Sequence, residues 1–288
     1  MVNLSSVFPW WSKIILKIIL SRLPFSYQFF RFVGIFKHGE MQDSQYAFKV
    51  FNSLILKSYS PDFLVGKTIL ELGVGDSLPT ALIAASFKAN SILVDNGYYA
   101  SENIETYKHL YHYLGKIGLT PPDIRCAESI EEYLNICGSC YMTSGLLDLK
   151  KLDAGSVDLI FSNAVLEHIC LSEFSFTIKE LHRVQKSDGA SHHVIDLKDH
   201  LGGGLNNLRF SRKVWESSLF SNSGFYTNRL RASQIINIFI KEGFIIKDSD
   251  VKSYPCLPIP LYSMNGEFRD LDVSDLLINQ IFILATRF

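Results

Sequence analysis

The chain has 288 residues, a length that favours one domain with additions over two independent domains. With 47% hydrophobic, 13% aromatic and 20% charged residues, the composition is that of a globular protein and excludes a disordered or collagen-like chain. The 28 basic and 29 acidic residues give a formal net charge of -1, so there is no basic excess and we expect no nucleic-acid partner.

The segment at residues 13–23 is apolar, but Lys13, Lys17 and Arg22 interrupt it, so it is too broken to span a membrane. No signal-peptide cleavage site follows it. At helical period one face collects apolar side chains, which predicts an amphipathic helix: Trp11, Ile14, Ile15, Ile18 and Ile19. We expect this helix to pack on the domain as a cap. The alternative is a peripheral helix lying on a membrane surface.

A second helix is predicted over 43–58, so residues 1–60 are expected to form a helical cap. From residue 67 onward strands alternate with helices, the signature of a parallel sheet covered on both faces. We predict strands at 68–73, 91–95, 140–143, 157–162, 191–197, 244–252 and 277–286, and helices at 79–88, 102–116, 172–184 and 233–242. The connection before the last strand contains prolines and lacks a helical pattern, so an antiparallel pair is expected at the end of the sheet.

The predicted core, residues 61–288, contains one long irregular stretch at about 198–232. Loops of this length are usually functional or disordered. Aromatic residues argue against disorder and favour a folded insertion over the active-site edge: Phe210, Trp215, Phe220, Phe225 and Tyr226.

Five cysteines are present, and their odd number without a disulfide pattern predicts a reducing, cytoplasmic location. Cys137 and Cys140 form one CxxC pair. Because no second pair follows at finger-like spacing, we interpret them as ordinary thiols and expect no metal; a metal or redox site is the alternative.

The most informative segment runs from Thr68 to Thr80, where a strand leads through a glycine-bearing turn into a helix. This arrangement puts backbone amides at the carboxyl edge of the sheet, where open α/β sheets bind ligands. A dinucleotide loop needs a third glycine, but Leu78 stands at that position, which weakens an NAD hypothesis. The pattern Glu71-x-Gly73-x-Gly75 instead resembles the nucleotide-binding loop of class I S-adenosylmethionine-dependent methyltransferases, with Ser77 replacing a third glycine.

Three further segments extend this resemblance over about residues 60–288. Asp95 ends the second strand, where the family carries the acid that binds the ribose hydroxyls. Residues 156–169 look like the fourth strand and its following turn, and residues 180–189 resemble the helix and turn that lead into strand five. The resemblance implies a Rossmann-like α/β fold with a mostly parallel seven-stranded sheet, an antiparallel end strand and helices on both faces. It also implies S-adenosylmethionine as cofactor, held by Glu71, Gly73, Gly75, Asp76, Ser77, Asp95, Asn96, Asn163 and Ala164.

Members of the family commonly carry the acid that binds adenine just after strand three. At that position this chain has Leu146. Asp148 is the nearest carboxylate, and we leave open whether it contacts adenine or is an ordinary surface charge.

Methyl transfer to a hydroxyl needs a group that removes a proton, which a neutral histidine or a carboxylate can do. His192 and His193 begin strand five and lie too far from its carboxyl edge, so we expect them to be structural. Asp196, Asp199 and His200 fall at or past that edge. Asp199 and His200 are a candidate catalytic pair, or they stabilise the loop.

His168, beside the cofactor turn, is a second candidate base, or an ordinary histidine at a helix start. A polar cluster in the insertion is a candidate acceptor site, with Asp196 beside it: Tyr226, Asn228, Arg229 and Arg231. The alternative is that Arg229 and Arg231 pair with helix carboxylates. His38 and Gly39 are suggested near the cofactor's carboxylate.

The resemblance implies a methyltransferase, and we predict O-methylation of a small-molecule or glycan-type acceptor, with N-methylation also open. Two alternatives remain: a non-catalytic binding module of the same fold and an NAD-dependent oxidoreductase.

Overall fold

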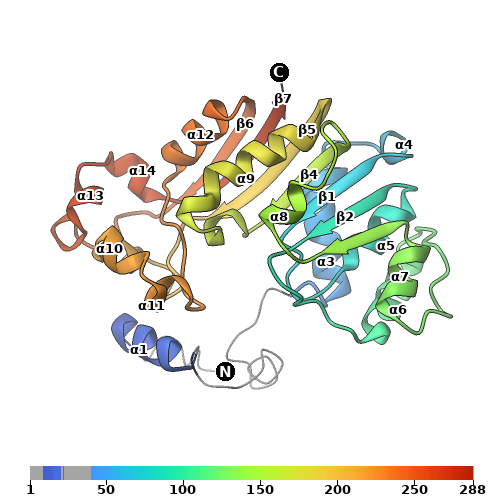
Figure 1. Cartoon of the computed structure of the whole chain (residues 1–288), viewed down its shortest axis with the longest axis horizontal. Helices are drawn as coiled ribbons and strands as arrows, with labels where there is room; N and C mark the ends of the chain where they lie inside the picture. The colour runs from blue at the N-terminus through green and yellow to red at the C-terminus, as the bar shows by residue number, and fades with distance from the viewer. Residues whose placement is uncertain (1–8, 21, 23–39, 288) are drawn as a thin grey trace.

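The computed structural model describes residues 9–20, 22 and 40–287, so His38 and Gly39 lie outside the described residues. Its centre is a seven-stranded sheet with the order β3-β2-β1-β4-β5-β7-β6 (Figure 1). The strands are β1 (Thr68–Leu72), β2 (Asn90–Val94), β3 (Ser139–Met142), β4 (Val157–Asn163), β5 (Gln185–Asp196), β6 (Phe244–Ser253) and β7 (Ile278–Arg287). The predicted mostly parallel seven-stranded sheet is confirmed.

The central strand β1 pairs in parallel with β2 on one side and with β4 on the other. The chain order of the strands therefore reverses direction at β1, and the crevice beyond the carboxyl ends of β1 and β4 is where such sheets bind ligands. Strand β7 runs antiparallel to both β5 and β6. The antiparallel strand thus lies one place inside the edge, and β6 forms the edge itself.

Helices cover both faces of the sheet (Figure 1). One face carries α3 (Ser44–Phe51), the π-helix η2 (Asn52–Leu56), α5 (Pro79–Ser86), α6 (Ile104–Lys116) and α7 (Ile130–Ile136), whose apolar side chains join one buried cluster. The other face carries α8 (Leu146–Leu149), α9 (Leu171–Val184) and α12 (Ala232–Lys241), which form a second cluster. The short helix α4 (Pro61–Leu64) precedes β1.

Several short helices were not predicted, and two differences concern longer elements of the sheet and its cover. Helix α7 was not predicted, because it has only seven residues, although Ser129 accepts a hydrogen bond from Glu132 N and caps it. Strand β5 begins at Gln185 and not at 191, because Gln185 pairs with Val157 ahead of an irregularity in the ladder. The polar residues 186–189 carry no alternating apolar pattern, so no strand is predicted there.

The insertion after β5 folds as η4 (Asn206–Arg209), α10 (Arg212–Trp215) and α11 (Ser218–Ser221). Its predicted aromatic residues gather in a third buried cluster around Trp215. Between β6 and β7 the chain forms η5 (Leu261–Ser263), α13 (Gly266–Arg269) and α14 (Val273–Leu277), which supply most of a fourth cluster.

Helix α1 (Trp10–Leu20) packs on this insertion through Ile14, with Trp10 and Ile18 beside it (Figure 1). The predicted single apolar face is divided: Ile14 is buried, whereas Trp11, Ile15 and Ile19 are each more than half exposed. Lys17 Nζ donates a hydrogen bond of 3.1 Å to the carbonyl of His200. Among the described residues no helix has the length and apolar character needed to cross a membrane.

Candidate functional site

The turn after β1 is built on two glycines with left-handed backbone, Gly73 with φ +76° and Gly75 with φ +69°. Such angles strain any residue that carries a Cβ. At Gly73 the neighbouring space is also filled, because an added Cβ would lie 2.3 Å from Cγ2 of Val165. The sequence explained Gly73 by the turn and by ligand approach; the structure adds that the turn following β4 packs directly against it.

Asp95 follows the last residue of β2, and its carboxylate faces the glycine turn. It accepts hydrogen bonds from Gly75 N at 3.2 Å and from Asn96 N at 2.7 Å. Burial raises the pKa of Asp95, and these backbone N–H groups oppose the rise. Asp95 is half-buried and Asn96 is exposed. The predicted ribose acid therefore lies beside the predicted loop.

Three other predicted cofactor residues, Glu71, Asp76 and Ser77, are almost fully buried. Burial, with a smaller contribution from the nearby Asp95, raises the pKa of Glu71 to about 8. Within the described part of the chain, Oε2 of Glu71 has no hydrogen-bond partner. Asp76 supports the turn through its carbonyl, which accepts a hydrogen bond from Ser101 N at 3.0 Å.

Asp148, the candidate adenine acid, is buried and not a free surface charge. Its carboxylate accepts hydrogen bonds from Lys151 Nζ and from Ser144 N, each at 2.6 Å. The Lys151 ammonium, followed by Ser144 N, lowers the pKa of Asp148. Asp148 therefore holds the turn at the start of α8, and its role toward adenine stays a prediction.

Asn163 is the last residue of β4, and the turn after it carries Ala164 and the 3-10 helix η3 (Leu166–His168). Ala164 has φ +56°, which is unusual for a residue with a side chain, and its N–H donates to the carbonyl of Val194 at 2.8 Å. Strained backbone of this kind clusters at functional sites, so the observation supports the prediction made for this turn.

Asn228 fixes the same turn from the insertion. Its Nδ2 donates to the carbonyls of Leu166 at 2.8 Å and Ile169 at 3.1 Å, and its backbone N–H donates to the carbonyl of Glu167 at 2.7 Å. His168 Nδ1 contacts the carbonyl of Tyr226 at 3.0 Å. The segment 226–228 is therefore a strap across the turn after β4.

The predicted acceptor cluster in the insertion is used inside the protein. Tyr226 OH donates to Glu216 at 2.8 Å. Arg229 donates to the carbonyl of Phe210 at 2.6 Å, and its guanidinium lies between the rings of Trp215 and Phe268. Burial lowers the pKa of Arg229 to about 10.

Arg231 is 1% exposed, and it donates hydrogen bonds to the carbonyls of Leu197, Asp275, Leu276 and Ile278. These side chains are thus already bonded within the protein, and acceptor binding by this cluster stays a prediction that the contacts do not support. The alternative, pairing with helix carboxylates, fits Arg229, which lies 3.4 Å from Glu267 of α13, whereas Arg231 binds backbone carbonyls.

Asp199, predicted to orient His200, has a different task. Its buried carboxylate accepts hydrogen bonds from Leu201 N, Gly204 N and both the backbone and the side-chain amide of Asn206. It therefore organises the loop that carries His200, the second of the readings that the sequence left open. Asp196 is half-buried and pairs with Lys198.

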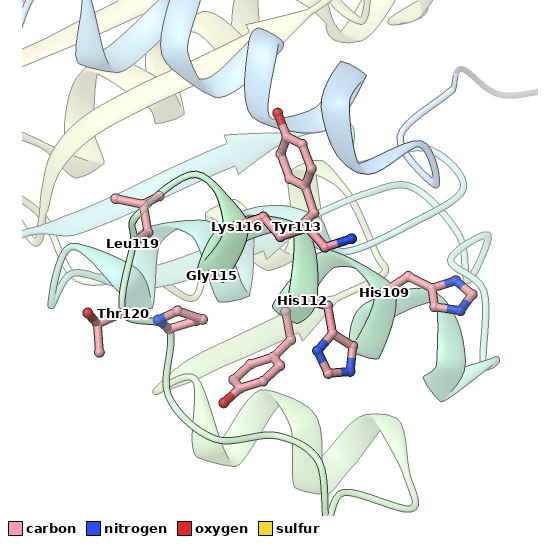
Figure 2. Close-up of a pocket in the computed structure, with 9 residues that line it drawn as sticks. His109, His112, Tyr113, Gly115, Lys116, Leu119 and Thr120 are labelled. Atoms are coloured by element: carbon pink, nitrogen blue, oxygen red, sulfur yellow. The ribbon is translucent and has the colours of Figure 1, made fainter.

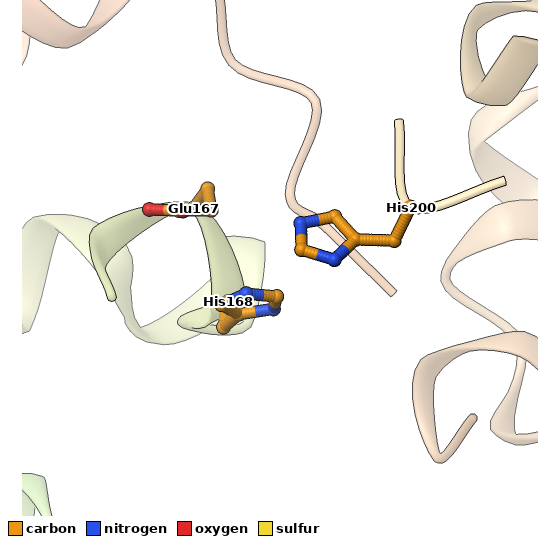
Figure 3. A group of neighbouring side chains, drawn as sticks. All are labelled: Glu167, His168 and His200. Carbon is orange, nitrogen blue, oxygen red and sulfur yellow. The ribbon is translucent and has the colours of Figure 1, made fainter. Parts of the chain in front are cut away.

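The two candidate bases do meet. The rings of His168 and His200 lie 4.7 Å apart at an interplanar angle of 71°. His200 comes from the loop after β5 and approaches the turn that carries Glu167 and His168 (Figure 3). One potential ligand atom from each of these three residues lies within 4.8 Å of the others. Burial lowers the pKa of His200, so its imidazole is neutral near pH 7.

Glu167 was not singled out from the sequence. It is 2% exposed, and burial raises its pKa to about 8 against the opposing effect of backbone N–H groups. A carboxylate next to a candidate base in the segment Leu166-Glu-His was visible, but its burial depends on distant parts of the chain.

His192 and His193 lie inside β5, in agreement with the expectation that they are structural. Tyr59 OH contacts His192 Nε2 at 3.1 Å, and Ser162 Oγ contacts His193 Nδ1 at 2.8 Å. Burial lowers the pKa of His192 to about 4 and that of His193 to about 3.

A separate hollow lies on the outer side of α6, where His109, His112 and Lys116 are among the lining residues (Figure 2). None of its lining residues comes from the strand ends described above. This hollow is therefore distinct from the site at the carboxyl edge.

Comparison with known proteins identifies the domain. Residues 70–192 match a family model described as a methyltransferase domain. No curated protein sequence matches the chain. Among solved structures, the chain is similar to a putative S-adenosylmethionine-dependent methyltransferase from Listeria monocytogenes, with 16% identity, 81% of this chain and 96% of that chain covered, and a TM-score of 0.45.

Two more solved structures are similar to the chain. A methyltransferase of the same cofactor class from Methanosarcina mazei has 14% identity, 81% and 97% coverage and a TM-score of 0.47. Phosphoethanolamine N-methyltransferase 2 from Haemonchus contortus has 17% identity, 81% and 51% coverage and a TM-score of 0.44.

The matched model begins in β1 and ends in β5, so it covers the glycine turn, Asp95 and the turn after β4. The order of the seven strands and the glycine turn after β1 agree with it. Residues 70–192 therefore form a methyltransferase domain, which agrees with the resemblance to class I S-adenosylmethionine-dependent methyltransferases and with the S-adenosylmethionine cofactor that it implies.

Proposed function

We propose that this enzyme methylates a hydroxyl oxygen of a small-molecule or glycan-type acceptor. The observation that carries the proposal is the pair of imidazoles, His168 and His200, whose rings are 4.7 Å apart at the carboxyl edge of the sheet. An oxygen nucleophile must lose its proton as it attacks, and a neutral imidazole within reach accepts one. The formal net charge of -1 gives no support to a nucleic-acid acceptor.

The residues at this edge fit the cofactor. When bound, S-adenosylmethionine supplies a methyl group on a positively charged sulfur. The half-buried carboxylate of Asp95 can accept two hydrogen bonds from a vicinal diol, and we assign it the ribose hydroxyls. We propose that the remainder of the cofactor contacts the backbone of Gly73 and Gly75 and the residues Asn163 and Ala164.

We propose that His200 accepts the proton that the acceptor hydroxyl loses. Its Nε2 is buried and, among the described residues, has no hydrogen-bond partner, so it is available to an acceptor. The Nδ1 atom of His168 donates to the carbonyl of Tyr226, which leaves the lone pair of that ring at Nε2. We propose that His168 orients the acceptor hydroxyl next to His200.

The test compares His200→Ala with His112→Ala, a control on the exposed surface of α6. Release of S-adenosylhomocysteine is measured with a panel of alcohols, phenols, sugars and amines, and cofactor affinity is measured by calorimetry. We expect turnover with hydroxyl acceptors, lost in His200→Ala without loss of cofactor affinity. Turnover with amines alone would replace O-methylation by N-methylation, and cofactor binding without turnover would favour a non-catalytic module.

Three coarser assignments accompany this proposal. We propose residues 1–60 as a cap and 61–288 as the methyltransferase core, with support from the packing of α1 on the insertion. The free state of all five cysteines supports a cytoplasmic location. A peripheral membrane contact through α1 stays the alternative to a simple cap.

A further inference from the structure

Glu167 presents a problem that the proposed function does not solve. The side chain is 2% exposed, and among the described residues neither carboxylate oxygen has a hydrogen-bond partner of good geometry. A buried carboxylate that only poorly aligned backbone N–H groups support is disfavoured unless a cation or a proton neutralises it. The groups nearest in the cluster are the imidazoles of His168 and His200, which carry lone pairs.

Each imidazole presents a nitrogen suited to a metal ion. The carbonyl of Tyr226 only accepts, so Nδ1 of His168 carries the hydrogen and Nε2 the lone pair. A backbone carbonyl on the second ring nitrogen is the usual support of a metal-binding histidine. Nε2 of His200 is buried and, within the part of the chain that the structure describes, makes no hydrogen bond.

The three side chains are held by built supports. Asn228 fixes the turn with Glu167 and His168 through three hydrogen bonds. Asp199 fixes the loop with His200 through four. Metal sites need this kind of positioning of their ligands before the ion arrives.

The surrounding charges do not oppose a cation. Two negative charges, Asp196 and Asp199, and two positive charges, Lys17 and Lys198, act on His200. These four charges balance, so an ionised Glu167 leaves the cluster with one net negative charge. A divalent ion would displace the proton from Glu167 and then lie in a site of net negative charge.

We propose that Glu167, His168 and His200 bind one divalent transition-metal ion, whose remaining coordination positions take oxygen atoms of the acceptor. Two histidines and one glutamate are a donor set of catalytic zinc sites, and related sets hold iron or manganese. Three protein ligands leave positions open, and a metal ion there lowers the proton affinity of a bound hydroxyl.

The inference rests on the proposed function, because it concerns the same acceptor site. It departs from the sequence-based expectation of no metal, which considered only the cysteines. The ligand atoms lie within 4.8 Å of one another, whereas tetrahedral zinc needs roughly 3.3 Å between them, so the three side chains must draw together on binding.

The experiment uses the full chain, free of any affinity tag and treated with chelator. CoCl2 is titrated into the protein, because Co(II) occupies zinc-type sites and reports its coordination by visible absorption. The variants are Glu167→Gln, which keeps the shape, and His200→Asn, with His112→Gln as the control. S-adenosylhomocysteine affinity and thermal unfolding are measured on the same samples.

We expect one Co(II) per chain in the wild type and the control, and affinity reduced by about 10- to 100-fold or more in the two site variants. Cofactor affinity and folding should be unchanged. Failure of the wild type to bind Co(II), or wild-type affinity in both site variants, overturns the metal site. If a site variant unfolds, His168→Asn takes its place under the same criteria.

The two proposals fail separately. Stoichiometric Co(II) binding together with turnover of amines alone refutes O-methylation and keeps the metal site. Hydroxyl methylation by a chelator-treated enzyme that binds no Co(II) refutes the metal site and keeps O-methylation.

Discussion

Replacing Gly73 by alanine tests the packing of the glycine turn against the turn after β4. Two costs add. The left-handed φ of +76° costs an alanine about 1–2 kcal/mol. The new Cβ would also lie 2.3 Å and 2.5 Å from the two Cγ atoms of Val165, and overpacking of this kind costs about 1–3 kcal/mol. We expect the free energy of unfolding to fall by about 2–5 kcal/mol, a large part of the stability of a typical domain.

Two further variants separate these costs. Gly66→Ala has nearly the same φ, +73°, with no described atom within 4 Å of the new Cβ, so it should show only the backbone cost. Gly73→Ala combined with Val165→Ala should recover part of the clash, giving a favourable coupling energy in the double-mutant cycle. Urea unfolding supplies the free energies. Equal losses in Gly66→Ala and Gly73→Ala, or a coupling energy of zero, would refute the reasoning.

Three more variants test individual assignments. Asp95→Asn should weaken S-adenosylhomocysteine binding by about 1.5–3 kcal/mol in calorimetry, because hydrogen bonds to a charged group are lost. His193→Asn should make the free energy of unfolding depend less on pH below about 6.5. Burial and His192 lower the pKa of His193 from 6.5 to about 3, so below pH 6.5 the unfolded chain takes up a proton that the native ring excludes. Wild type therefore loses about 1.4 kcal/mol per pH unit, roughly 2 kcal/mol from this ring by pH 5 in urea titrations. Arg231→Met should lower the free energy of unfolding by about 2–4 kcal/mol, because four buried carbonyls lose their donor.

Each variant has a matched control. Asp123→Asn alters an exposed carboxylate, and cofactor affinity equal to this control in Asp95→Asn would remove the ribose assignment. His112→Asn alters an exposed ring, and an acid limb of the same slope in His193→Asn and this control would show that His193 takes up its proton in the folded state. Unchanged unfolding of Arg231→Met would mean that water replaces the guanidinium at no cost.

The sequence predicted the sheet well, because most of its strands are buried on both faces and read as short apolar runs between turns. β1 and β2 were each placed within one residue of their observed ends. The parts it missed lack that signal, as the polar beginning of β5 does. Helix α1 was predicted as a helix, but apolar residues occur on more than one side of it, so periodicity alone did not say which side would be buried.

The candidate site was predictable where chemistry and position coincide along the chain. Gly73, Gly75 and Asp95 could be singled out because they come directly after predicted strands or at their ends. The bonds of Arg231 were not predicted, because its partners lie more than 30 residues away in sequence, and only the folded chain shows that its donors are already occupied. Glu167 was overlooked for the same reason, since its burial is a property of the tertiary structure.

The strap at 226–228 has a consequence for engineering acceptor choice. Trp215, in the middle of the insertion's aromatic cluster, donates from Nε1 to the carbonyl of Thr227 at 2.7 Å, between the two strap residues that hold the histidine turn. Exchanging the insertion for that of another enzyme would thus loosen the imidazole at His168 as well as replace the segment next to the carboxyl edge of the sheet. A transplanted insertion must therefore contain an equivalent of the strap. Without it, the chimera would bind a new acceptor but would not methylate it.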